Sequence, residues 1–432
     1  MNKNPFTFGN PIRDPSRFFG RKDAIRQIVN RLMSSAHEST SIVGERRIGK
    51  TSLLNYLSNP DAAASLGLST DRYCLVYIDF QGLTDITPQR FWQRVLRKLA
   101  NTVADANLAK EIRTVAKMES FDIFDLEDMF EIISTKGLTV VLLMDEFEYV
   151  TQNSKFKEDF FGGLRALAIH QNLALIPSTR RELVDLCHSE ELKGSPFFNI
   201  FANVVLRPFS EGEVRELMRG YMVATEIVLS DEDETFIINL AGGYPFFVQM
   251  AGNYLVEAKL HETPQDHSYQ RATADFEEQV DPHYSYMWTH CSESEKITLL
   301  AVIALSNQKP SNKTLPNMEN LSKIHARAQI DIPALVKRGL LLEDEKNSFR
   351  LLSPILERWI MREIAAIPGE EESERSVAEW LHAGGKEDLT LVKGALPKIK
   401  KKYWPVVSSV IKDVSFEIAG AALFEILLKT LT

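Results

Sequence analysis

Residues 41–57 read SIVGERRIGKTSLLNYL, and this stretch decides the fold. A short apolar run ends at Gly44, a charged turn leads to Gly49-Lys50-Thr51, and an amphipathic helical pattern follows. The spacing G-x-x-x-x-G-K-T between a strand and a helix is that of a P-loop, whose backbone N–H groups surround nucleotide phosphates. We therefore expect Lys50 to reach the β- and γ-phosphate oxygens and Thr51 to ligate Mg²⁺ at the helix N-terminus. The residues predicted to contact the nucleotide here are Gly44, Glu45, Arg46, Arg47, Ile48, Gly49, Lys50, Thr51 and Ser52.

Five short segments have the composition of buried strands. Apart from the last, each is apolar at nearly every position rather than alternating, which is typical of strands buried on both faces of a parallel sheet. Helical patterns separate them, so the sequence predicts an α/β fold with a parallel sheet. The segments are 40–43, 74–80, 138–144, 173–177 and 203–206.

Two acidic residues end the third predicted strand, in TVVLLMDEFEYV at 139–150. A P-loop site needs a carboxylate at the end of a neighbouring strand to hold Mg²⁺, and Asp145 has that position. Glu146 follows directly, where it can orient or deprotonate an attacking water, which favours a nucleotide hydrolase over a small-molecule kinase. The strand predicted at 74–80 comes between the P-loop and Asp145, so the pattern is that of the additional-strand class of P-loop ATPases.

Arg180 follows the fourth predicted strand, in LALIPSTRREL at 173–183. Ligands of open α/β sheets collect at the carboxyl ends of the strands, so Arg180 can contact a γ-phosphate and report its loss. The predicted catalytic residues are Lys50, Asp145, Glu146 and Arg180, and the predicted Mg²⁺ ligands are Thr51 and Asp145.

After the last predicted strand, helical patterns dominate. Three helices followed by an apolar–acidic–apolar hairpin have the order of a winged helix. The acidic run GEEESERS at 369–376 is typical of a linker. The sequence thus predicts a P-loop nucleotide-binding domain with an N-terminal arm (1–207), a helical lid (208–285), a winged helix (290–366) and a C-terminal helical segment (377–432).

Together these motifs resemble those of the STAND branch of the AAA+ P-loop ATPases, which are signal-transduction ATPases related to NB-ARC and NACHT switches and to archaeal ORC-like ATPases. The resemblance covers about residues 5–365. RFFGRKDAI at 17–25 is similar to a hydrophobic-hydrophobic-Gly-Arg-Glu box that helps to seat the adenine, although Lys22 replaces the usual acid. This similarity implies that Phe19, Gly20 and Arg21 lie on the adenine side of the site.

Two further motifs carry the resemblance. STR at 178–180 is similar to the sensor-1 motif, which implies that Arg180 senses the γ-phosphate. GYP at 243–245 is similar to a Gly-x-Pro motif, which implies that Pro245 lies against the adenine. Relatives often add a His from the winged helix that clamps ADP, but the comparable stretch FRLLSPILERW, 349–359, has none.

The resemblance implies an ATP/ADP-dependent switch with Mg²⁺ as the metal. Family members hold ADP in a closed form until a trigger permits exchange for ATP, oligomerisation with further copies of the same chain, and clustering of an attached effector. Hydrolysis is slow and resets the switch, and many bacterial members act in conflict or defence systems. The trigger itself is not named by the sequence.

A second interpretation is an ORC-like ATPase that binds DNA through its winged helix. The net charge of -9 argues against a general nucleic-acid binder, because such binders neutralise phosphates with Lys and Arg. The candidate recognition helix, DIPALVKRG, offers only Lys337 and Arg338, and the wing tip EDEKNS at 343–348 is acidic. Phosphate contacts position a protein before bases are read, so nucleic acid is the less favoured partner.

The C-terminal segment 377–432 leaves three interpretations open. A Lys cluster with Tyr403 and Trp404 precedes an apolar stretch, a pattern that can lie on a membrane surface. The same pattern fits a helical hairpin packed on the main body, or a small homotypic domain that recruits an effector protein. No run of about 18 uncharged apolar residues occurs, the N-terminus has no signal-peptide pattern, and three widely spaced cysteines suit a reducing compartment. We therefore expect a cytoplasmic protein, with membrane association on activation as one of the alternatives.

Overall fold

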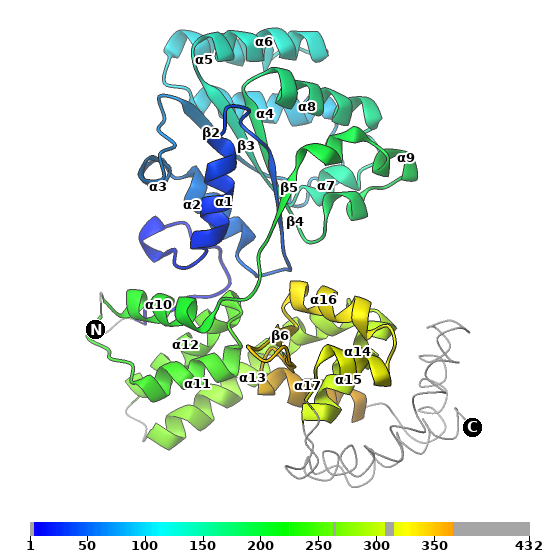
Figure 1. Ribbon diagram of the computed structural model, residues 1–432. Helices are drawn as coiled ribbons and strands as arrows, with labels where there is room; N and C mark the ends of the chain where they lie inside the picture. The colour runs from blue at the N-terminus through cyan, green and yellow to red at the C-terminus, as the bar shows by residue number, and fades with distance from the viewer. Residues whose placement is uncertain (1–3, 224, 262–264, 307–314, 366–432) are drawn as a thin grey trace. The chain divides into compact units, whose positions relative to one another are not determined.

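The computed structural model describes residues 4–223, 225–261, 265–306 and 315–365 (Figure 1). The chain forms two compact units, one of Phe8–Thr225 and one that combines Met1–Thr7 with Glu226–Thr432. The predicted linker and the segment 377–432 lie outside the described residues. Among the helices of the described ranges, none is both long and apolar enough to span a bilayer.

The first unit contains a five-stranded sheet in which every neighbouring pair is parallel. The order β2-β3-β4-β1-β5 places β4 between the P-loop strand β1 and the strand β3 that ends at Asp145. This confirms the prediction of a parallel-sheet P-loop ATPase fold of the additional-strand class. The strands are β1 Thr40–Val43, β2 Tyr73–Asp79, β3 Thr139–Asp145, β4 Leu173–Thr179 and β5 Ala202–Val205.

Helices cover the sheet of this unit because its strands are apolar toward both faces. Every residue of β3 and β4 is buried. Alternate residues of β2, β3 and β4 share one core with α4, α5, α6 and α8, whereas α2 contacts β2 and β3 and α1 contacts β5. The helices are α1 Lys22–Leu32, α2 Lys50–Ser58, α3 Pro60–Ser65, α4 Pro88–Thr102, α5 Ala106–Val115, α6 Ile123–Thr135, α7 Glu148–Thr151, α8 Glu158–His170, α9 Glu190–Lys193 and α10 Glu211–Met222, with 3₁₀ turns η1 Pro15–Arg17, η2 Leu183–Leu186 and η3 Pro196–Ile200.

The described residues of the second unit from Glu226 on form helices and one hairpin. Its helices α14, α15 and α16 and the antiparallel strands β6 and β7 follow the order predicted for a winged helix, and assignment to that motif stays a prediction. Helix α13 runs without a break through the predicted boundary at 285 and tolerates Pro282 in its interior. The elements are α11 Asp231–Ala241, α12 Pro245–Leu260, α13 Gln265–Thr289, α14 Glu293–Ser306, α15 Met318–Ile324, α16 Ala328–Arg338, β6 Leu341–Glu343, β7 Phe349–Leu351 and α17 Pro354–Ala365.

The start of the arm is anchored on α12 in the second unit. Phe6 is fully buried, and its ring lies so close to Gly252 that a Cβ there would come within 2.7 Å of it. The side-chain amide of Asn4 donates to the backbone carbonyl of Asn253 at 2.9 Å, and the side-chain amide of Asn253 donates to the backbone carbonyl of Phe6 at 2.8 Å. These contacts fix residues that carry no regular secondary structure.

The following residues of the arm are anchored in the first unit. Ile12 N donates to Ser52 Oγ at 3.0 Å, and Asn55 Nδ2 donates to Ile12 O at 3.1 Å, so α2 holds both backbone polar groups of one residue. Arg47 of the P-loop donates to Gly9 O at 2.5 Å. Between Asn4 and Phe19 the one regular element is the 3₁₀ turn η1.

Candidate nucleotide site

The register of the sheet brings the sequence motifs to one edge. Val43 pairs with Thr179 across β1 and β4, and Met144 pairs with Pro177 across β3 and β4. Gly44 N donates to Thr179 O at 3.1 Å, which ties the start of the P-loop to the end of β4. The loop, the acidic pair and the arginine after β4 therefore follow strands that end together.

Two glycines give the P-loop its shape for different reasons. Gly49 has a φ of 104°, a conformation that side chains disfavour, and it is the N-cap of α2. Gly44 is needed for space, because a Cβ there would lie 2.8 Å from Ile48 Cγ2 and 3.2 Å from Leu206 O. The loop is thus packed against the chain that follows β5 and ends at a helix N-terminus, which favours anions.

Lys50 lies inside this loop. It is 5% exposed, and its ammonium donates to Gly44 O at 2.8 Å and to Glu45 O at 3.3 Å. Burial lowers the pKa of Lys50 from its ordinary 10.5, and the charges of Glu146, Glu148, Asp145 and Glu45 oppose this shift. The ammonium is therefore held near the loop carbonyls within an acidic surrounding.

Arg21, in the RFFGRKDAI stretch at 17–25, holds the P-loop backbone through hydrogen bonds. Its guanidinium is buried and donates to Ile48 O at 2.8 Å and to Arg207 O at 2.5 Å. Its backbone N–H donates to Glu213, the residue that also completes the capping box of α10. The structure places Arg21 on the P-loop backbone, and its predicted contact with the adenine side of a nucleotide stays a prediction.

The other residues of the box pack on neighbouring helices. Phe19 lies edge-on against Tyr221 of α10, over Gly220, and Phe18 stacks on Tyr56 of α2 with ring centroids 4.5 Å apart. Gly20 has a φ of 72°, and a Cβ there would meet the Phe209 ring at 2.9 Å. Lys22, which replaces the usual acid, pairs on the surface with Glu216.

The Asp145 carboxylate accepts hydrogen bonds from three different residues. Ser178 on β4 donates to Oδ1 at 2.5 Å, and the backbone N–H of Glu146 donates to the same oxygen at 3.1 Å. The hydroxyl of Tyr77 on β2 donates to Oδ2 at 3.1 Å. Burial, together with the charge of Asp145, raises the pKa of Tyr77 above its ordinary 10.0, which keeps the hydroxyl protonated as a donor.

Glu146 turns the chain sharply after the strand. Its φ of 52° is left-handed, which is uncommon for a residue with a side chain and recurs at functional sites. Burial and the neighbouring Glu148 raise the pKa of Glu146 above its ordinary 4.5, while Lys50 opposes them. A carboxylate with a raised pKa is the stronger base, which suits the predicted role in activating water.

Arg180 is paired with a residue that the sequence did not single out. Its Nε donates to Glu148 Oε1 at 2.9 Å, and the Glu148 side chain is 1% exposed against 37% for Arg180. Glu148 is the first residue of α7 and comes three positions after Asp145. The sequence pattern did not point to Tyr77 or Glu148, although the third acid in the DEFE stretch was a visible signal.

Pro245 is the one predicted site residue in the second unit. It occupies the first position of α12, where its missing N–H costs nothing and its ring suits the helical φ. Gly242, just before it, has a φ of 62°, and a Cβ there would overlap the Leu352 carbonyl. The turn is thus packed within its own unit, and the role of Pro245 toward adenine stays a prediction.

The residues at the sheet edge fit a nucleotide with Mg²⁺. A carboxylate has about four acceptor positions, and Asp145 uses three, so one on Oδ2 remains. Asp145 and the hydroxyl of Thr51 are hard oxygen donors, which Mg²⁺ prefers. Mg²⁺ is usually bound by one or two protein oxygens together with substrate phosphates and waters, so phosphates would supply further ligands.

Comparison with protein families matches residues 21–309 to the family described as Novel STAND NTPase 2, nSTAND2. The match spans more than half of the 432 residues and includes the P-loop, Asp145 and Arg180. The chain belongs to this family. This nSTAND2 protein is therefore a P-loop NTPase, as the resemblance of its motifs to STAND ATPases predicted.

One solved structure with a TM-score above 0.5 agrees with this at the level of the fold. The nSTAND2 chain is similar to the Walker-type ATPase paby2304 of Pyrococcus abyssi, at 15% identity and a TM-score of 0.53, over 82% of this chain and 98% of that one. It also matches the ORC2 protein of Aeropyrum pernix in its ADPNP-ADP complexes, at 14% identity and a TM-score of 0.48, over 84% and 99%. No curated protein matched the chain.

Proposed function

We propose that this chain is an ATP/ADP-dependent signal-transduction switch with slow, regulatory ATP hydrolysis. In the ATP state it assembles with further copies of itself and clusters a C-terminal module, residues 377–432, that recruits an effector protein or a membrane. Membership of the nSTAND2 family supports the NTPase part of this proposal. The role in bacterial conflict or defence signalling is proposed from the resemblance of the motifs to STAND switches.

Different residues at the sheet edge bind the phosphates, hold the metal and activate water. Lys50 exchanges the carbonyls of Gly44 and Glu45 for the β- and γ-phosphates, and the loop N–H groups bind the remaining oxygens. Thr51 and Asp145 hold Mg²⁺, which neutralises charge that develops on the phosphates when it is bound. Glu146 orients the attacking water and accepts its proton.

One observation carries the proposal of a switch rather than of a simple phosphate-binding site. Arg180, the residue that would contact the γ-phosphate, is tied at 2.9 Å to Glu148, which follows the acidic pair on β3. The group that would distinguish ATP from ADP is therefore linked to the segment that would hydrolyse ATP. A nucleotide-dependent change at Arg180 can act directly on the strand end that carries Asp145 and Glu146.

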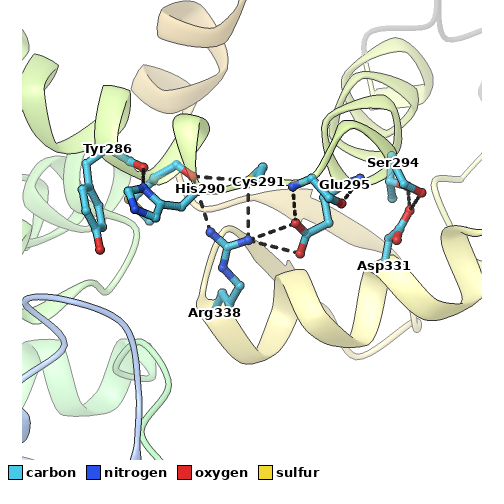
Figure 2. A network of polar contacts seen from close by, with 10 residues as sticks. Tyr286, His290, Cys291, Ser294, Glu295, Asp331 and Arg338 are labelled. Atoms are coloured by element: carbon cyan, nitrogen blue, oxygen red, sulfur yellow. Dashed lines mark hydrogen bonds and ion pairs between the residues drawn. The ribbon is translucent and has the colours of Figure 1, made fainter. Parts of the chain in front are cut away.

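The contacts of the second unit favour this proposal over DNA binding. Arg338, one of two cations in the candidate recognition helix, donates to both oxygens of Glu295 at 3.1 and 3.2 Å (Figure 2). Both side chains are 13% exposed, so this guanidinium is committed to the interior. Asp331 on the same helix is 4% exposed and accepts hydrogen bonds from Ser294 and Thr298. Because Arg338 is engaged in this ion pair, the helix has one cation fewer with which to contact DNA phosphates.

The proposal is tested by nucleotide content and mass. The purified protein is analysed for co-purifying nucleotide, and its mass is then measured by light scattering with ADP and with ATP and Mg²⁺. We expect bound nucleotide, a monomer with ADP, and a larger assembly with ATP once the trigger is present. Lys50→Ala should abolish nucleotide binding, and Glu146→Gln should bind ATP and accumulate the assembly.

Two outcomes would contradict the proposal. If Lys50→Ala binds ATP with wild-type affinity, the P-loop lysine does not bind the nucleotide and the proposed mechanism is wrong. A Glu146→Gln protein that stays monomeric with ATP and the trigger would contradict the switch, even if hydrolysis is lost.

A further inference from the structure

Glu148 carries a carboxylate whose burial is unfavourable for the free energy of folding. Its side chain is 1% exposed, and only Oε1 has a hydrogen-bond partner, Arg180 Nε at 2.9 Å. Oε2 is buried without a hydrogen-bond partner among the described residues. Burial of an incompletely paired carboxylate is unfavourable, and a native structure that retains one calls for an explanation.

The backbone fixes Glu148 relative to Arg180. Phe147 N donates to Ser178 O at 3.1 Å, which joins the residue before Glu148 to the strand position two residues before Arg180. The first turn of α7 then begins at Glu148, whose carbonyl accepts from Gln152 N at 3.0 Å. Glu148 is therefore the immobile partner of the pair, whereas the Arg180 side chain is 37% exposed.

The contact uses one edge of the guanidinium. Arginine has five N–H donors in a fixed planar fork, and Nε accounts for one of them. A carboxylate that holds the Nε edge sets the plane of the fork and reduces the rotamer freedom that the long side chain would lose on binding a phosphate. A phosphate that meets the guanidinium in this plane then binds with a smaller loss of side-chain entropy.

We propose that Glu148 is a positioning residue that orients Arg180 toward the γ-phosphate and thereby sets the preference of the site for ATP over ADP. The proposal rests on the proposed function, namely that the nucleotide binds at Gly44–Thr51 with its γ-phosphate near Arg180. ADP has no γ-phosphate, so its affinity does not depend on how Arg180 is held. Glu148 is distinct in role from Asp145 and Glu146, because it acts only through Arg180.

The direction in which ATP affinity changes when the Glu148 carboxylate is neutralised distinguishes this role from two others. If Glu148 positions Arg180, neutralising the carboxylate weakens ATP binding and leaves ADP binding unchanged. If Glu148 instead withholds Arg180 from the nucleotide, the same change tightens ATP binding. If Glu148 serves only packing, ATP and ADP affinities fall together or not at all.

The test measures ATP and ADP affinities of the full chain. Glu148→Gln keeps the size of the side chain and removes its charge, and the dissociation constants are measured with ADP and with a non-hydrolysable ATP analogue. We expect the affinity for the analogue to fall about tenfold to a hundredfold, as loss of a hydrogen bond to a charged group implies, with ADP affinity within about twofold of wild type. Asp85→Asn, which neutralises the exposed acid paired with Lys155, is the matched control and should change neither affinity.

A double-mutant cycle shows whether Glu148 acts through Arg180. Arg180→Lys retains the positive charge and lacks the planar fork, so it should weaken analogue binding, and adding Glu148→Gln to it should have little further effect. An unchanged ATP/ADP ratio in Glu148→Gln, tighter analogue binding, or equal losses for both nucleotides would overturn the assignment. If the wild type binds neither nucleotide, the proposed function fails, and this inference fails with it.

Discussion

At the scale of single residues, the acidic end of β3 depends on neighbours that fix its carboxylates. Asp145 is oriented by Tyr77 and Ser178 from the strands on either side, and Glu146 is held in a left-handed conformation directly after it. Removal of a partner that orients a metal ligand typically lowers metal affinity by about tenfold to a hundredfold. The hydroxyl of Ser178 is therefore expected to affect Mg²⁺ rather than the nucleotide itself.

Ser178→Ala tests this expectation. The substitution removes the 2.5 Å hydrogen bond to Asp145 Oδ1 and leaves the carboxylate with two of its three donors. We expect the apparent Mg²⁺ affinity of the nucleotide complex to fall about tenfold, with little change in nucleotide binding without Mg²⁺. A titration of Mg²⁺ followed with a fluorescent ADP analogue measures both quantities.

The control for this prediction is Ser65→Ala in α3, where the hydroxyl bonds only to a carbonyl of its own helix. Equal Mg²⁺ dependence in Ser178→Ala and the wild type would show that Ser178 does not position the ligand.

The sequence predicted some of these residues and not others for a physical reason. Lys50 and Asp145 are defined by spacing along the chain and by their place after an apolar strand, so local pattern is sufficient. Tyr77 and Glu148 depend on partners in other strands, 68 residues away for Tyr77 and 32 for Glu148. Only the register of the assembled sheet brings those groups together, and no local pattern encodes it.

At the scale of elements, a buried ionic cluster joins three helices of the second unit. Asp233 in α11 is fully buried and accepts from Lys259 of α12 at 2.5 Å and from the Tyr269 hydroxyl of α13 at 2.9 Å. It also closes the capping box of its own helix by accepting from Ser230 N. Burial alone would raise the pKa of Asp233, but these hydrogen bonds outweigh it and hold the pKa below the ordinary 3.8.

Lys259→Met should therefore lower the stability of the second unit at neutral pH. Loss of a hydrogen bond to a buried charge costs about 2 kcal/mol, because the other donors to Asp233 remain. Since the folded-state pKa of Asp233 lies below its unfolded value, its contribution is present above pH 3.8 and is lost as pH falls through the folded-state pKa. Chemical denaturation at pH 7 and near pH 3 should show a large difference from wild type at pH 7 and a smaller one at the lower pH.

Lys136→Met is a suitable control for this prediction, because Lys136 pairs with Asp105 on the surface of the first unit. Exposed pairs contribute little, so its stability should follow the wild type at both values of pH. A Lys259→Met difference that does not shrink with acid would mean that the loss comes from packing rather than from the charge of Asp233.

Elements were predicted best where hydrophobic pattern and context agreed. The five strands were found within one or two residues, because strands covered on both faces are apolar throughout. The end of α15 depends on more than such a pattern: the helix stops at Ile324, where His325 becomes extended and its ring contacts Asp331 at 3.3 Å. That tertiary contact, and not local propensity, ends the helix.

At the scale of the whole molecule, the arm is the part whose position sequence could least predict. Its residues bond to partners up to 253 residues away along the chain. Phe6 is the main apolar anchor, fully buried over Gly252. We expect Phe6→Ala to destabilise the second unit by about 3 kcal/mol, as truncation of a buried phenylalanine does, and to expose the arm to proteases.

Limited proteolysis with mass spectrometry measures the release of the arm, and thermal unfolding measures the loss of stability. Phe124→Ala removes a phenylalanine that is 68% exposed and should change neither. Protection of the arm in Phe6→Ala equal to that in the wild type would show that the polar contacts of Asn4 and Asn253 are sufficient to hold it.

The anchoring of this arm also orders the chain where it passes from one unit to the other. That passage occurs at Thr7–Phe8 and again at Thr225–Glu226. Residues 4–7 are held on α12, and residues 9–12 are held on the P-loop and α2. Fixing the backbone of one residue costs about 1–2 kcal/mol of conformational entropy, so release of either anchor would return that entropy to several residues at once. The burial of the Phe6 ring therefore also sets how ordered the N-terminal end of this NTPase is.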